Sequence, residues 1–65
     1  MYRVSQQGPG GTAIPGTGVE IPAANCFAAA LSVARTMRDT LRPEAVALIA
    51  VSPRGGRRYR FELRN

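Results

Sequence analysis

The sequence predicts a small α+β domain in which one helix packs on one face of a four-stranded antiparallel sheet, in the order ββαββ. Three observations predict this fold. Residues 22–42 are alanine-rich and have helical periodicity, residues 45–51 are apolar at every position, and residues 58–64 alternate strictly between apolar and charged side chains. With 65 residues, the chain makes one domain, 1–65, whose own core is marginal for its size.

Two short strands are expected before the helix. Residues 2–7 place Tyr2 and Val4 on one face and polar residues on the other, and residues 19–21 form a second, shorter strand. Between them, residues 8–18 contain five glycines and two prolines, a composition that predicts a flexible connector. We expect the two strands to pair antiparallel across it.

The helix is predicted over residues 22–42. Pro22 suits the first turn, Asn25 would be the N-cap if the helix starts later, and Pro43 ends it because its ring excludes helical geometry for the preceding residue. The apolar positions of the predicted buried face are Cys26, Phe27, Ala30, Val33, Ala34, Met37 and Leu41.

A hairpin closes the chain. The apolar run 45–51 predicts a central strand, and a type I turn at Pro53 followed by a left-handed Gly55 or Gly56 leads into the last strand, 58–64. Its Tyr59, Phe61 and Leu63 should face the helix, because the alternative would bury arginines at a cost of several kcal/mol each. One apolar side of the central strand then has no cover, and we expect a homodimer or a bound partner to supply it. That side is either Val46, Leu48 and Ala50 or Ala47, Ile49 and Val51.

The charged residues exclude several kinds of chemistry. The chain has no histidine and no lysine, its four carboxylates are scattered, and Cys26 is its one cysteine, so the sequence predicts neither an enzyme nor a metal or cofactor site. Cys26 is interpreted as a small core residue in a reducing compartment. With no apolar run long enough to cross a membrane, we expect a cytoplasmic protein without a membrane partner.

Arginine is the residue that points to a partner. Nine arginines and four acids give a net charge of +5. Planar guanidinium groups suit phosphates and carboxylates, although arginine without lysine is also what a GC-rich genome would encode, and both interpretations stay open. The candidate partner-binding residues are the helix flank Leu31, Arg35, Arg38 and Arg42 and the hairpin residues Arg54, Arg57, Arg58, Arg60 and Arg64.

The order of these elements resembles a known group, the small phage and mobile-element proteins that inhibit CRISPR immunity. The resemblance rests on the strand that starts at Tyr2, on Val19-Glu20-Ile21 running into an alanine-rich helix, and on the closing hairpin AVALIAV-SPRGG-RRYRFELR. It implies an inhibitor, in the cytoplasm of the host cell, that binds Cas subunits of an RNA-guided surveillance complex or the nuclease it recruits, and so blocks target DNA. Since many such inhibitors are acidic DNA mimics and this chain is basic, acidic protein surfaces or joint contact with protein and nucleic acid are the implied targets.

Two other functions fit the same composition. The segment RGGRRYR, residues 54–60, resembles arginine/glycine segments that contact nucleic-acid backbones, so a basic nucleic-acid-binding module is one alternative. A structural subunit whose sheet is completed by neighbouring subunits is the other.

Overall fold

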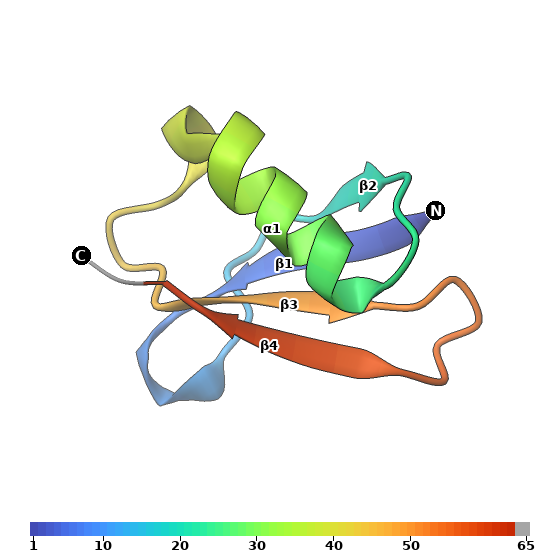
Figure 1. The fold of residues 1–65 in the computed structure, drawn as a ribbon. Helices are drawn as coiled ribbons and strands as arrows, with labels where there is room; N and C mark the ends of the chain where they lie inside the picture. The colour runs from blue at the N-terminus through green and yellow to red at the C-terminus, as the bar shows by residue number, and fades with distance from the viewer. Residues whose placement is uncertain (64–65) are drawn as a thin grey trace.

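The structure is a computed structural model that describes residues 1–63, and it confirms the predicted α+β fold with the element order ββαββ (Figure 1). Two short 3₁₀ turns are added to the predicted elements. The elements are β1 (Tyr2–Gln7), η1 (Pro9–Gly11), β2 (Val19–Ile21), α1 (Cys26–Thr36), η2 (Arg38–Thr40), β3 (Ala47–Val51) and β4 (Arg58–Glu62).

The four strands form one antiparallel sheet in the order β2-β1-β3-β4. As predicted, β1 and β2 pair across the glycine-rich segment and the apolar strand β3 is central. Figure 1 shows α1 crossing one side of the sheet, with the segment between β1 and β2 at the opposite end of the sheet from the β3–β4 turn. We call the side under α1 the covered face and the other side the open face.

The core lies between α1 and the covered face. The register sets Val4 opposite Ala50 and Leu48 opposite Phe61, so these side chains point to the same side of the sheet. Val4 and Leu48 are the largest fully buried side chains, and burial of one such side chain stabilises the fold by about 1.5–3 kcal/mol. The helix contributes Ala29, Ala30 and Val33, whose small side chains let α1 approach the strands closely.

The helix is shorter at both ends than predicted. It begins at Cys26 because Asn25 is the N-cap, and the Asn25 side chain accepts a 2.8 Å hydrogen bond from the backbone N–H of Ala28. It ends at Thr36, since Met37 has non-helical angles (φ −122°, ψ 35°). The prediction of one helix over residues 22–42 was therefore wrong, and Arg38 and Arg42 lie outside α1.

The reason for the early helix end lies on β1, where Gln6 is 3% exposed on the covered face. Its Nε2 donates to the carbonyl oxygen of Thr40 (2.9 Å), and its Oε1 accepts from the N–H of Arg42 (2.7 Å). These two bonds satisfy backbone groups that a continuing helix would have paired internally. The backbone N–H of Gln6 also donates to Thr17 Oγ1 (3.0 Å), which ties the glycine-rich segment to the same strand.

The closing hairpin is formed as expected, with shorter strands. β3 starts at Ala47 rather than at residue 45, and β4 is described as far as Glu62; the predicted strand end at Arg64 lies outside the described residues. The left-handed turn residue is Gly55 (φ 71°), whose N–H donates to the Ser52 carbonyl oxygen (2.8 Å). The Ser52 hydroxyl accepts 3.1 Å bonds from the next two backbone N–H groups and so fixes the exit of the turn.

Candidate partner-binding surface

The open face contains charged side chains that cover part of β3. It is formed by Arg3, Ser5, Gln7, Glu20, Ala47, Ile49, Val51, Arg58, Arg60 and Glu62, as the strand registers require. Arg60 Nε donates to Gln7 Oε1 (3.1 Å), and the Arg60 guanidinium also forms an ion pair with Glu62.

One residue of β3 on this face is unexpectedly buried. Ala47 has 0% exposure, and the Arg60 side chain runs across β3 next to it, since Arg60 contacts both cross-strand partners of Ala47, Gln7 and Glu62. The expectation that this side of the central strand lacks cover is therefore wrong at Ala47, while Ile49 and Val51 stay partly exposed. Arg60, a predicted partner-binding residue, is engaged within the sheet.

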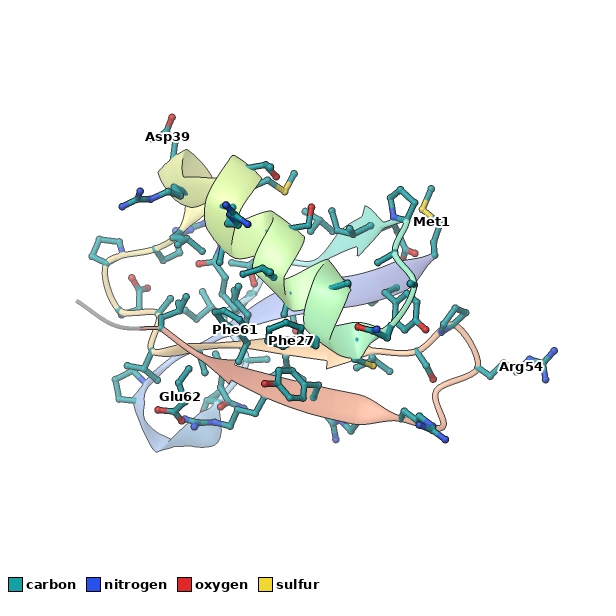
Figure 2. All side chains as sticks on the ribbon, viewed as in Figure 1. Met1, Phe27, Asp39, Arg54, Phe61 and Glu62 are labelled. Carbon is teal, nitrogen blue, oxygen red and sulfur yellow. The ribbon has the colours of Figure 1, made fainter. Side chains whose placement is uncertain are left out.

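The other hairpin arginines are free of such partners among the described residues. Arg54 lies at the tip of the β3–β4 turn and points away from the fold (Figure 2), and Arg57 and Arg58 follow where the chain enters β4. Within residues 1–63 the ion pairs are Arg3–Glu20 (3.3 Å) and Arg60–Glu62, so none of these three arginines forms one there.

The predicted helix flank is not formed as one surface. Arg35 is in α1, Arg38 in η2 and Arg42 in the connection to β3, and Leu31 is partly buried rather than exposed. The structure does bring Arg38 and Arg42 together at the C-terminal end of α1. They line a hollow of about 560 Å³ whose apolar lining includes Leu41, Phe61 and Leu63; Arg35 and Leu31 are not part of it.

An aromatic cluster between α1 and β4 was missed by the sequence reasoning. Phe27, predicted to be buried, is 48% exposed, and its ring makes an edge-on contact with Tyr59 (centroids 5.6 Å apart, planes at 86°). Phe61 lies 5.9 Å from Phe27 on its inner side, as Figure 2 shows for these two labelled rings. Tyr59 is itself 39% exposed. The alternation of β4 correctly placed Tyr59 and Phe61 toward the helix, but it did not indicate that Phe27 lies at the exposed edge of the core.

A second hollow opens beside this cluster, at the N-terminal end of α1. Its volume is about 480 Å³, and the residues that line it include Tyr2, Phe27, Tyr59, Arg57 and Arg58. The register directs the Arg58 side chain to the open face, so Arg57 is the arginine assigned to the hollow. We call it the aromatic hollow. No carboxylate lines it. Aromatic faces next to guanidinium groups can bind a planar, negatively charged ligand by stacking and by charge.

Other chemistry has little support in the described residues. No group of three or more His, Cys, Asp or Glu side chains among residues 1–63 is placed to hold a metal ion. Cys26 is a partly buried free thiol that packs against the core, in agreement with its interpretation as a core residue.

Comparison with protein-family models, curated proteins and solved structures finds no match for the chain. None of the described helices combines the length and the apolar character needed to cross a membrane. Function is therefore inferred from the chemistry of the surfaces themselves.

Proposed function

We propose that this chain is a small non-enzymatic binding protein that inhibits a CRISPR surveillance complex by docking on it through unpaired arginines. The proposal combines the resemblance in element order with the charge distribution of the surface. Such an inhibitor acts in the cytoplasm of the host cell, and its partner is a Cas subunit or the ribonucleoprotein as a whole.

One observation carries the proposal. Eight of the nine arginines lie within residues 1–63, and two of these eight, Arg3 and Arg60, form the ion pairs found there. The remaining six have no acidic partner among the described residues, and they are Arg35, Arg38, Arg42, Arg54, Arg57 and Arg58. A 65-residue protein that leaves six guanidinium groups unpaired keeps a strong attraction for an acidic or phosphate-bearing surface.

The distribution of these six arginines also indicates how docking would block function. They occupy two ends of the molecule, the hairpin turn beside the aromatic hollow and the C-terminal end of α1. Two separated basic contacts fix the orientation of a small protein on its partner better than one does, because each restricts rotation about the other. A protein held in this way beside the entry path of target DNA would exclude the DNA by occupying its place.

The test is a binding and inhibition assay. The purified protein is mixed with a guide-loaded surveillance complex from a plausible host, passed over a sizing column, and assayed for target-DNA binding by the complex. We expect co-elution and loss of target binding. A protein that neither co-elutes with nor inhibits the complex contradicts the proposal.

A charge-matched pair of variants tests the surface. Arg57→Gln/Arg58→Gln removes two positive charges beside the aromatic hollow and should weaken inhibition at least tenfold, as expected when close charge pairs are lost. The control Thr12→Glu/Ala13→Glu lowers the net charge equally, at exposed positions in the segment between β1 and β2. Equal losses in both variants would show that net charge alone, and not this surface, is responsible.

A further inference from the structure

The aromatic hollow combines features that the proposed function leaves unexplained. Three of the four aromatic residues of the chain, Tyr2, Phe27 and Tyr59, line it, although a domain of this size would gain more stability by burying them in its core. Phe27 and Tyr59 instead expose 48% and 39% of their surface. Exposed rings gathered at one hollow, rather than scattered singly, indicate a binding site.

The rings are held in place by local contacts. Phe27 is in the first turn of α1, which is fixed by the Asn25 cap, and its edge-on contact with Tyr59 joins the helix to β4. The Tyr2 hydroxyl donates to the Ala24 carbonyl oxygen at 3.4 Å, which holds the third ring against the start of the helix. Because the three rings are borne by three different elements of one packed unit, the hollow is formed before a ligand arrives.

The charge around the rings restricts the class of ligand. Arg57 lines the hollow, no acidic residue does, and Arg57 has no ion-pair partner among the described residues. An apolar partner would have to leave this guanidinium group without counter-charge. A ligand with planar rings joined to phosphates satisfies both the exposed rings and Arg57.

We propose that the aromatic hollow binds single-stranded nucleic acid, with an unstacked base against the ring of Phe27 or Tyr59 and an adjoining phosphate on Arg57. Duplex nucleic acid does not fit, because its bases are stacked inside the helix and present no free ring face to the hollow. The inference does not depend on the identity of a protein partner. It applies to the isolated chain.

The direct measurement is fluorescence anisotropy with labelled single strands of about 12 nucleotides, a length within the range that single-strand-binding domains cover. Oligo-dT and oligo-U are used in parallel to distinguish DNA from RNA, and a duplex of the same length is the structural control. We expect binding of at least one single strand, weaker binding of the duplex, and affinity that falls with salt by a log–log slope of about −0.7 for each phosphate contacted.

Ring-removing variants test the stacking. Phe27→Leu and Tyr59→Leu keep apolar volume but remove a ring, and each should weaken binding about fivefold or more. Because both positions are well exposed, the fold should persist, as thermal unfolding will verify. A second readout is intrinsic: both tyrosines of the chain line the hollow and there is no tryptophan, so stacking should quench the tyrosine fluorescence.

Matched arginine variants test the position of the phosphates. Arg57→Gln should reduce the salt slope by about 0.7, whereas Arg54→Gln, which removes the same charge at the turn outside the hollow, should change it less. Three results would overturn the inference: no single-strand binding at low salt, binding that the ring variants leave unchanged, or tighter binding of a poly-glutamate peptide than of either oligonucleotide. The last result would assign the hollow to an acidic protein segment.

Discussion

The two faces of β3 are both apolar in sequence but are covered by different means. On the covered face, Leu48 and Ala50 are fully buried under α1. On the open face, Ala47 is equally buried without a helix above it, and the side chain of Arg60, held between Gln7 and Glu62, runs across the strand next to it. A strand that is apolar on both sides therefore does not by itself require a partner protein, because long arginine side chains can shield the second side.

The same comparison divides the arginines into two groups. Arg3 and Arg60 are paired with acids and contribute to the sheet, whereas Arg57 and Arg58 stand beside exposed rings without an acidic partner among the described residues. Counting arginines in the sequence cannot separate these roles. The predictions below test whether the faces and the arginine groups differ as the structure indicates.

The largest effect is expected for Leu48→Ala. Removing a fully buried leucine from the covered face should lower the free energy of unfolding by about 3 kcal/mol, a large part of the stability of so small a domain. Its matched control, Ile49→Ala on the open face, should cost about 1 kcal/mol because Ile49 is only partly buried. Urea unfolding measures both; equal losses would mean that the open face is as well packed as the covered one.

The next largest loss of unfolding free energy is expected at Gln6, with its neighbour Gln7 on the opposite face as the control. Gln6→Ala should cost about 2 kcal/mol, since it removes a buried side chain whose two part-buried hydrogen bonds hold the Thr40 carbonyl and the Arg42 N–H. Gln7→Ala, which removes one exposed bond to Arg60, should cost about 0.5 kcal/mol. Hydrogen exchange of the Arg42 amide gives a local readout, and unchanged protection in Gln6→Ala would show that the segment is held by other contacts.

A smaller effect separates the arginine groups. Arg60→Ala should lower the free energy of unfolding by about 1 kcal/mol, through loss of its side chain across β3, of its hydrogen bond to Gln7 and of its ion pair with Glu62. Arg58→Ala, on the same strand and face, should change it by less than about 0.5 kcal/mol. If thermal or urea unfolding ranks the two variants in the opposite order, the assignment of Arg60 to structure and of Arg58 to binding fails.

The smallest effect concerns self-association. The sequence predicts that a homodimer or a bound partner covers the second side of β3, and what remains to be covered there is the exposed part of Ile49 and Val51. We expect only weak self-association, visible by sedimentation at high protein concentration and abolished by Ile49→Glu. A stable dimer that Ile49→Glu leaves intact would place the interface elsewhere on the molecule.

The element order and most strand faces were predictable because they depend on local patterns. The alternation of β4 set Tyr59 and Phe61 toward the helix, and Pro53 with Gly55 set the turn. The helix ends were not predictable in the same way. Residues 22–24 and 37–42 continue the apolar periodicity, but the C-terminal limit is associated with hydrogen bonds from Gln6, more than 30 residues away in sequence.

The arrangement of the candidate site was likewise not predictable from local sequence patterns. The helix faces the sheet with Ala29, while Phe27 lies at the edge of the core. Because α1 ends at Thr36, the flank expected for Arg35, Arg38 and Arg42 is divided among three segments. The hairpin arginines were located correctly along the chain. The ion pair of Arg60 is with Glu62, two residues along the same strand, but the contact of Arg60 with Gln7 depends on strand register, which composition does not specify.

The central place of β1 in the sheet has a consequence for how the protein is made. β1 leaves the ribosome before the other described strands, yet its longer pairing is with β3, which is synthesised about 40 residues later. Until β3 arrives, the emerging chain has only the three-residue ladder with β2 and one edge of β1 unpaired. Folding must then wait for the second half of the chain, so the nascent protein stays open to chaperones and proteases until the last hairpin closes.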